Sequence, residues 1–400
     1  MNEQEKKQME NFNYFAPTKV VFGKGTEQQT GQLVKECGCR KVLIHYGSGS
    51  VKKSGLLDRI CASLDQAEVD YVTLGGVVPN PRLSLVYEGI ELCRKESVDF
   101  ILAVGGGSVI DSAKAIGYGV SNEGDVWDFY AKKRTPQGCL PLGVVLTIAA
   151  AGSEMSNSSV ITKEEGWEKR GCNSDYVRPK FAVTNPELTM TLPAYQTESG
   201  CVDIMMHTME RYLNQAENME LTDGISECLI RTVMKNARIL LENPRDYEAR
   251  AEVMWAGSLS HNGLTGCGTD GGDWASHQLE HELGGMYDVA HGAGLAAVWG
   301  SWARYVMDAR PERFARFAVQ VMGVEDTGNA METAEKGIQA MEEFYRFVQM
   351  PTSLRELGVE PTEEILRELA RKCSFDGGRT IGCVKKLDQE DIFRIYQNAR

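Results

Sequence analysis

The sequence predicts an α/β domain over residues 1–192, built on a mostly parallel sheet, followed by an all-α domain over residues 193–400. Three observations support this fold class. Six β-rich runs alternate with amphipathic stretches of helical length in the first half. Helical periodicity replaces this alternation from Pro193 onward. The length of 400 residues is enough for two domains of ordinary size, and the hydrophobic content of 42% is enough for a large core.

The six β-rich runs of the first half are expected to form strands, at residues 19–22, 41–46, 69–74, 98–104, 142–147 and 180–184. Stretches near 26–37, 54–66, 82–96 and 108–119 are expected to form helices between them. Strands that alternate with helices imply right-handed crossovers and a mostly parallel sheet. The apolar run at residues 100–104 is typical of a strand buried on both faces. Ligands bind such sheets at the carboxyl ends of the strands, so the loops there are candidate sites.

The loop after the fourth expected strand contains three consecutive glycines, Gly105, Gly106 and Gly107, followed by Ser108 and a helix. Glycines let the backbone approach a phosphate closely, and the N–H groups of the following helix point at the anion. A glycine or two is common in any turn between a strand and a helix. Three in a row before a helix favour a phosphate-binding loop.

The loop after the second expected strand bears on the choice of dinucleotide. NAD-binding loops usually carry an acidic residue that bonds the ribose hydroxyls, and residues 47–55 contain none. Ser48, Ser50, Lys52 and Lys53 could instead meet a 2′-phosphate, and Gly47 at the start of the loop is a further candidate for cofactor binding. In the alternative interpretation, the two lysines simply begin a solvated helix. We expect NADP(H), with NAD(H) possible.

Four of the six histidines lie in two short windows. Asp203 and His207 are four residues apart, which places both on one face of a helix. His277 and His281 repeat that spacing. His291 follows a Gly284-Gly285 pair, which we expect to end the second helix and turn the chain back.

A single Asp/His pair at this spacing arises readily by chance, but helix capping and packing do not account for the crowding. One Asp and three His without paired thiolates suit Fe(II), Zn(II) or Mn(II) better than a structural zinc site. We therefore predict a divalent-metal site formed by Asp203, His207, His277 and His291. His281 is left for proton transfer.

From Pro193 onward, helices are expected near residues 218–241, 245–264, 274–284, 292–306, 310–321, 328–348, 361–373 and 389–398. A helix also follows Pro193, which suits the first turn of a helix. Its residues Val202, Met206, Met209 and Tyr212 recur at helical intervals and are interpreted as core.

Composition excludes several classes of function. The net charge of −13 argues against nucleic acid or an anionic membrane as a partner. The eleven cysteines are scattered, and their only close pair is Cys37 and Cys39, which indicates neither a disulfide framework nor a zinc finger. The charged start at residues 1–7 is unlike a signal peptide, and no apolar run approaches the roughly 18 residues of a membrane span. We expect a soluble, cytoplasmic protein with reduced thiols.

Taken together, these motifs resemble the iron-containing (group III) alcohol dehydrogenases, in particular their NADP-dependent butanol dehydrogenase and aldehyde reductase branch. The resemblance covers nearly the whole chain. Besides the glycine loop with Asp111 and the Asp/His series, the matching segments are Val21 to Gly25, Val78 to Pro81, Gly152 to Glu154, and Thr191 to Pro193.

The resemblance implies a dehydroquinate synthase-like architecture with a Rossmann-like first domain, a homodimer, and the same four metal ligands. It places Gly106, Gly107 and Ser108 on the cofactor pyrophosphate. The further cofactor-binding residues that it implies are Asn80, Asp111, Thr147 and Lys169, of which Thr147 and Lys169 lie toward the nicotinamide.

Two departures from the family pattern affect the expected site. Many relatives carry a Thr where this chain has Ala151, which removes a hydroxyl that could touch the cofactor. The segment Cys267 to Gly272 is slightly longer than its counterpart and lies just before His277, where it could reshape the mouth of the pocket.

The expected activity is reversible hydride transfer between an alcohol carbon and the nicotinamide of NADP(H), as in the interconversion of butanol and butyraldehyde. One alternative is a metal- and nicotinamide-dependent lyase of the dehydroquinate synthase type. Such a site needs several Lys and Arg for its anionic substrate, whereas residues 260–300 contain neither. A non-enzymatic sensor that binds metal and cofactor is a second alternative, which leaves the intact cofactor loops unexplained.

Overall fold

The computed structural model describes residues 9–400, and the chain divides into two compact units. An α/β unit comprises residues 16–192 and 245–258. A helical unit comprises residues 9–15, 193–244 and 259–400. The main change of unit along the chain therefore falls between Leu192 and Pro193. Residues 245–258 lie with the α/β unit because Met254 is part of its core and Ser258 donates a hydrogen bond to Glu154.

The α/β unit is built on one six-stranded sheet in which every pairing is parallel, as the sequence predicted. Its strand order is β1-β8-β5-β4-β2-β3. The strands are β1 (Lys19–Phe22), β2 (Lys41–Gly47), β3 (Asp70–Val77), β4 (Phe100–Gly105), β5 (Leu142–Leu146) and β8 (Phe181–Thr184). An antiparallel hairpin, β6 (Ser158–Lys163) with β7 (Glu168–Asn173), was not predicted. Its strands are mostly polar, so they carry little hydrophobic signal.

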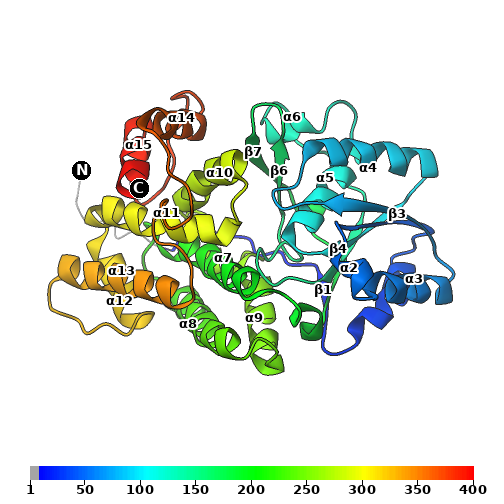
Figure 1. The fold of residues 1–400 in the computed structure, drawn as a ribbon, viewed down its shortest axis with the longest axis horizontal. Coiled ribbons are helices and arrows are strands. Elements are labelled where there is room, and N and C mark those ends of the chain that lie inside the picture. The colour runs from blue at the N-terminus through cyan, green and yellow to red at the C-terminus, as the bar shows by residue number, and fades with distance from the viewer. Residues whose placement is uncertain (1–8) are drawn as a thin grey trace. The chain divides into compact units, whose positions relative to one another are not determined.

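Helices cover both faces of this sheet (Figure 1). Alternate strand residues point to opposite faces, so Leu43, Ile101 and Ala103 join one core and Val42, Ile44 and Leu102 join the other. The helical segments are η1 (Thr26–Gln29), α1 (Thr30–Glu36), α2 (Ser50–Lys53), α3 (Leu56–Gln66), α4 (Leu83–Glu96), α5 (Gly107–Ser121), α6 (Trp127–Tyr130), η2 (Asp175–Val177), η3 (Pro186–Thr189) and α9 (Tyr247–Ser260). Helices α4 and α5 belong to the first core, and α1 and α3 to the second.

The two glycine loops leave neighbouring strands at the same edge of the sheet. Strands β2 and β4 are paired, and the chain leaves β2 toward β3 but β4 toward β5. The strand ends are in register: Gly47 pairs with Val77, and Gly105 with Leu146. A reversal of strand order of this kind is where open α/β sheets bind their ligands.

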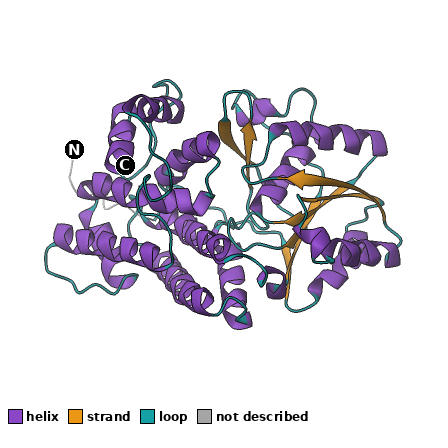
Figure 2. Cartoon of the chain, viewed as in Figure 1, coloured by secondary structure: helices purple, strands orange, loops and turns teal. Residues whose placement is uncertain are grey.

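The helical unit is organised around α7 (Ala194–Tyr212), in which every residue from Thr197 to Tyr212 is buried. Figure 2 shows the helices of both units in purple and the strands in orange. Helix α7 contacts α8 and α11, and α10 contacts α11 and α14. The other segments are α8 (Glu220–Glu242), η4 (Leu264–Gly266), α10 (Ala275–Tyr287), α11 (His291–Val306), η5 (Met307–Ala309), α12 (Pro311–Gln320), α13 (Ala330–Phe347), α14 (Glu363–Cys373) and α15 (Gln389–Asn398). Within residues 9–400, no helix is both long and apolar enough to span a membrane.

The expectation that Gly284 and Gly285 end their helix is wrong. Both glycines are buried inside α10, which continues to Tyr287. Asp288 ends the helix instead, with a left-handed φ of 54° that Asp tolerates better than most residues. The chain still turns and brings His291 back toward Asp203, but the turn forms about one helical turn later than predicted.

Candidate metal and cofactor sites

Helix α7 carries the first two predicted metal ligands on one buried face. Asp203 Oδ1 lies 3.3 Å from Nδ1 of His207, one helical turn later. Both side chains are about 5% exposed. The spacing of four residues predicted this pairing, and burial of α7 within the unit removes both groups from solvent.

The other two predicted ligands come from α10 and α11 and approach the same carboxylate oxygen. Nε2 of His277 lies 3.8 Å from Asp203 Oδ1, and Nε2 of His291 lies 3.7 Å from it. The His277 side chain is buried, whereas that of His291 is 26% exposed. The fold therefore gathers all four predicted residues around one oxygen, with its most accessible side at His291.

The donor atoms fit a divalent cation. Asp203 Oδ1, His207 Nδ1 and His277 Nε2 are buried and make no hydrogen bond within residues 9–400. Ligand atoms of Asp203, His207 and His277 all lie within 4.8 Å of one another. Two ligands bound tetrahedrally at roughly 2.0–2.1 Å are separated by about 3.3 Å, close to the spacing found here. Buried acceptors this close are costly unless a cation lies among them.

The pKa values of His277 and His207 are shifted in opposite directions. Burial lowers the pKa of His277, but its interactions with Asp203 and Glu210 outweigh burial and raise the pKa to about 9. Burial, with the nearby charges of His277 and Arg211, holds the pKa of His207 well below its ordinary value. The carboxylates thus favour one cation in a space where one histidine remains neutral.

Two glutamates beside the cluster were missed by the sequence analysis. Glu210 Oε1 lies 2.8 Å from Nδ1 of His277, and Glu280 Oε2 hydrogen-bonds Nδ1 of His291. Both glutamates are buried. Glu210 follows Asp203 by seven residues, and Glu280 follows His277 by three, so helical spacing places each near its cluster. Nothing in the sequence says which histidine either glutamate contacts.

Aromatic rings surround the cluster, and two of them were also missed. The ring of His261 lies 4.0 Å from that of His207, and the indole of Trp274 lies 5.1 Å from the ring of His277. The guanidinium of Arg211 stacks on Trp274 at 4.5 Å. His281 is half-buried, with its ring 5.9 Å from that of His291. His281 therefore borders the cluster without joining the group around Asp203.

The predicted phosphate loop leads directly into α5. Gly106 is the N-cap of α5 and has no side chain to satisfy the first N–H groups of the helix. A Cβ at Gly107 would lie 2.8 Å from the Cβ of Ala151, so only glycine lets these two loops approach so closely. The helix start thus presents N–H groups where an anion is stabilised.

Asp111 has a structural role in the same loop system. Its Oδ1 accepts a hydrogen bond from Ser153 Oγ at 2.7 Å, and its Oδ2 accepts one from the backbone N–H of Val160 at 2.9 Å. Burial raises the pKa of Asp111, against the opposing effect of Lys114. Asp111 thereby ties the loop after β5 to α5, and direct contact with a cofactor stays a prediction.

The remaining predicted cofactor residues surround the same edge of the sheet. Asn80 follows β3 with a left-handed φ of 51°, and Thr147 follows β5, its N–H donating to Gly105 O at 3.1 Å. Lys169 is buried in β7. The residues of the first loop are the exposed Ser48, Ser50, Lys52 and Lys53 with the half-buried Gly47. The ammonium of Lys52 lies 5.2 Å from the centre of the Tyr46 ring.

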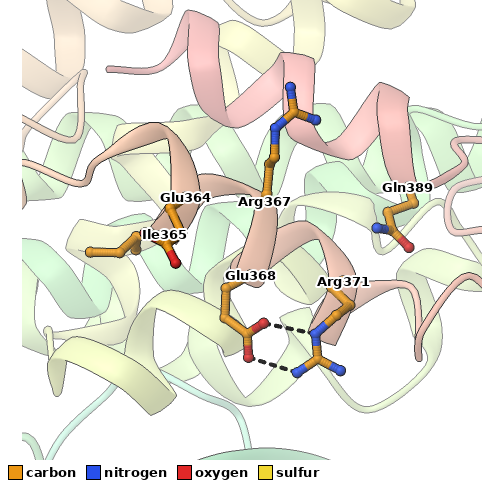
Figure 3. Close-up of a pocket in the computed structure, with 6 residues that line it drawn as sticks. All are labelled: Glu364, Ile365, Arg367, Glu368, Arg371 and Gln389. Carbon is orange, nitrogen blue, oxygen red and sulfur yellow. Dashed lines mark hydrogen bonds and ion pairs between the residues drawn. The ribbon is translucent and has the colours of Figure 1, made fainter.

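A surface hollow of about 430 Å³ on α14 has a different character (Figure 3). It is lined by Glu364, Ile365, Arg367, Glu368, Arg371 and Gln389. Arg371 forms two hydrogen bonds of 2.7 Å with Glu368. Arg367 binds Glu363 at 2.8 Å, so both guanidinium groups already have carboxylate partners. We assign no ligand to this hollow.

The molecule combines a parallel α/β unit that has a glycine-rich switch point with a helical unit that has an Asp-His cluster. These features are typical of nicotinamide- and metal-dependent enzymes. Two family models match the chain: "Iron-containing alcohol dehydrogenase" over residues 17–186 and "Fe-containing alcohol dehydrogenase family, C-terminal" over residues 197–400. The chain belongs to the iron-containing alcohol dehydrogenase family. Enzymes of this family use NAD(P)(H) and iron or another divalent metal to interconvert alcohols and aldehydes.

Three relatives illustrate the similarity. NADH-dependent butanol dehydrogenase A of Clostridium acetobutylicum is 40% identical over 98% of this chain and 100% of its own length. NADPH-dependent aldehyde reductase YqhD of Escherichia coli is 32% identical over 98% and 100%. The crystal structure of NADH-dependent butanol dehydrogenase A of Thermotoga maritima is 41% identical and superimposes with a TM-score of 0.94, over 98% of this chain and 99% of its own. The expected family and architecture are confirmed.

Proposed function

We propose that this enzyme interconverts primary alcohols and aldehydes of the butanol and butyraldehyde type by hydride transfer with NADP(H). A divalent metal, Fe(II) or Zn(II), would be held by Asp203, His207, His277 and His291. The observation that carries the proposal is the convergence of the three predicted histidine ligands on Oδ1 of the fourth, Asp203, at 3.3 to 3.8 Å. A metal held there would supply a Lewis acid toward the oxygen of the alcohol or aldehyde.

The side chains of this site have separate tasks. The buried rings of His207 and His277 exclude water from one side of the cluster. The half-buried His281 carries the proton exchanged between the substrate oxygen and solvent, because its ring borders His291 and its family position is not that of a ligand. The cofactor supplies the hydride chemistry, and the protein supplies alignment.

The cofactor would bind at the switch point, with Gly106, Gly107 and Ser108 at its pyrophosphate. Thr147 and Lys169 would contact the cofactor toward its nicotinamide, and Asn80 would make a further contact with the cofactor.

For NADP(H), the support is the first loop, which has two exposed lysines and no carboxylate between residues 47 and 55. For NAD(H), the support is the printed name of the 40%-identical Clostridium relative, which is NADH-dependent. The two cofactors are therefore compared directly in the experiment below.

A small, uncharged substrate is supported by the composition of the segment that carries His277 and His291. Residues 260–300 supply no Lys or Arg, so a phosphorylated or carboxylated substrate would find no cation from this segment. We further propose that the enzyme is a homodimer, as the resemblance implies. The scatter of the eleven cysteines along the chain, with a single close pair, supports the expected cytoplasmic location.

The test is NADPH oxidation with butyraldehyde by metal-free protein, reconstituted separately with Fe(II) and Zn(II). NADH is assayed in parallel, and His277→Ala is the control. Turnover that requires added metal, is lost in the control and prefers NADPH supports the proposal. Metal-independent turnover contradicts the Lewis-acid role. Tight NADPH binding without turnover of any aldehyde would favour the lyase or sensor alternatives.

The lysines are tested in the same assay. Lys52→Ala with Lys53→Ala should raise the KM for NADPH about tenfold and leave that for NADH unchanged, because only NADPH carries the 2′-phosphate. An equal change for both cofactors would contradict an assignment of the lysines to that phosphate. Lys95→Ala, an exposed lysine at the end of α4, is the matched control.

A further inference from the structure

We propose that Glu210 and Glu280 are positioning residues of the metal site, each holding one histidine of the cluster with its Nε2 turned toward Asp203. The inference rests on the proposed ligand set and adds two residues that the sequence did not single out. Glu210 on α7 hydrogen-bonds Nδ1 of His277 on α10, and Glu280 on α10 hydrogen-bonds Nδ1 of His291 on α11. Helix α7 thus orients the histidine on α10, and α10 orients the histidine on α11.

Glu210 makes the better-defined contact. Its Oε1 accepts hydrogen bonds from Nδ1 of His277 at 2.8 Å and from the backbone N–H of the same residue at 2.9 Å. A neutral imidazole that donates through Nδ1 must present the lone pair of Nε2. That atom is the one that lies 3.8 Å from Asp203 Oδ1. Glu210 therefore selects the tautomer and the ring orientation that a metal requires.

Glu280 acts in the same way on the most exposed histidine of the cluster. Its Oε2 hydrogen-bonds Nδ1 of His291, and Nε2 of that ring lies 3.7 Å from Asp203 Oδ1. Glu280 is fully buried, whereas the His291 side chain is 26% exposed. A rigid acceptor behind an accessible ring reduces the rotamer freedom that the ring loses when it binds a metal.

The side chain of Glu280 packs directly against the backbone of Gly294 on α11. A Cβ at Gly294 on α11 would lie 2.8 Å from Cγ of Glu280. Only glycine at that position lets α11 approach Glu280 closely enough for His291 to reach it. Gly294→Ala should therefore displace Glu280 without altering any polar atom, which makes it an independent probe of the same contact.

The experiment measures Zn(II) affinity of the full-length, metal-free protein by competition with a chromophoric chelator. The variants are Glu210→Ala, Glu210→Gln, Glu280→Gln and Gly294→Ala. Glu227→Gln is the matched control, because Glu227 is a buried glutamate of the same unit that hydrogen-bonds Tyr212 and Arg316 instead of a histidine of the cluster. Circular dichroism and thermal unfolding of the metal-free variants verify folding, and the visible spectrum of bound Co(II) reports ligand geometry.

We expect Glu210→Ala to weaken Zn(II) binding about 10- to 100-fold and to alter the Co(II) spectrum. Glu210→Gln should lie between Glu210→Ala and wild type, because its amide oxygen still accepts the bond but carries no charge. Glu280→Gln and Gly294→Ala should each weaken binding, and their double variant should lose less than the product of the two effects. Glu227→Gln should bind Zn(II) as wild type does.

Wild-type Zn(II) affinity and Co(II) spectra in the folded Glu210 and Glu280 variants would overturn the inference. If Glu210→Ala does not fold, the two Gln variants decide by the same criterion. His277→Ala separates this result from failure of the proposed ligand set. Wild-type affinity in His277→Ala would remove the ligand set itself, whereas loss of binding there with none in the glutamate variants would remove only the positioning role.

Discussion

His45 on β2 and Ser112 on α5 are joined by a hydrogen bond of 2.9 Å between Nε2 and Oγ, within the core of the α/β unit. Nδ1 of the same ring lies 2.9 Å from the carbonyl oxygen of Leu74 on β3. A carbonyl only accepts, so Nδ1 carries the proton and Nε2 accepts from the serine hydroxyl. A neutral imidazole thus connects two strands to the helix that begins at the phosphate loop.

This arrangement predicts acid sensitivity. Burial lowers the pKa of His45 from 6.5 to about 4, so the unfolded chain takes up a proton in a range where the folded chain does not. The contribution to stability is complete above pH 6.5, falls as the pH drops toward 4, and amounts to about 3 kcal/mol at 1.36 kcal/mol per pKa unit. Urea unfolding across this range checks it. His45→Gln should have a lower unfolding free energy at pH 7, but it should lose less of that free energy between pH 6.5 and 4. If the unfolding free energies of the variant and the wild type fell in parallel with pH, the assignment to His45 would be contradicted.

Lys114 is a fully buried ammonium held by five oxygens of Ser153, Ser156 and Ser158, at 2.7 to 3.2 Å. Lys114→Met would leave these acceptors, and the nearby Asp111, without a cation. We expect a loss of about 3 kcal/mol in unfolding free energy. Because Ser153 and Ser156 belong to the loop whose Ala151 lies beside Gly107, NADPH should also bind more weakly. Lys95→Met, at an exposed site, should change neither quantity, and an equal effect of the two variants would contradict the role of the buried site.

The start of α11 depends on close contact with α7. A Cβ at Gly292 would lie 1.9 Å from the backbone oxygen of Ser199, so Gly292→Ala must push His291 away from the cluster. We expect a loss of about 1–3 kcal/mol from overpacking and weaker Zn(II) binding. Gly224→Ala is the control, because Gly224 lies within α8 with open space at its Cβ position. That variant should gain up to about 1 kcal/mol. Thermal unfolding and chelator competition measure both effects.

The narrow approach of Gly107 to Ala151 predicts a specific rescue. Gly107→Ala places a methyl group 2.8 Å from the Cβ of Ala151, which should shift the loop and weaken NADPH binding about tenfold, or about 1.4 kcal/mol. The double variant with Ala151→Gly should recover part of that loss in a fluorescence titration. No recovery would mean that the added methyl group acts only on the cofactor.

The sequence by itself determined the secondary-structure plan and most of the candidate site. The alternation of apolar runs and helical stretches before Leu192 predicted a parallel sheet. Such a prediction is possible because the hydrophobic period of a strand or a helix can be recognised from residues that are close together in the sequence. For the same reason, the spacing of Asp203 and His207, repeated by His277 and His281, predicted two helices that each carry a candidate metal ligand. The same residues had already set His281 apart from the four candidate ligands, and the resemblance to the family implied the same ligand set.

Only the tertiary structure decided which of these local features meet. Glu210 and His277 are 67 residues apart, as are His45 and Ser112, and no periodicity links either pair. The polar hairpin β6–β7 was missed because hydrogen bonds between its strands, rather than hydrophobic patterning, define it. Local sequence states what each segment can bury. Which buried carboxylate faces which histidine depends on how helices distant in the chain pack, and that is settled only when the whole unit folds.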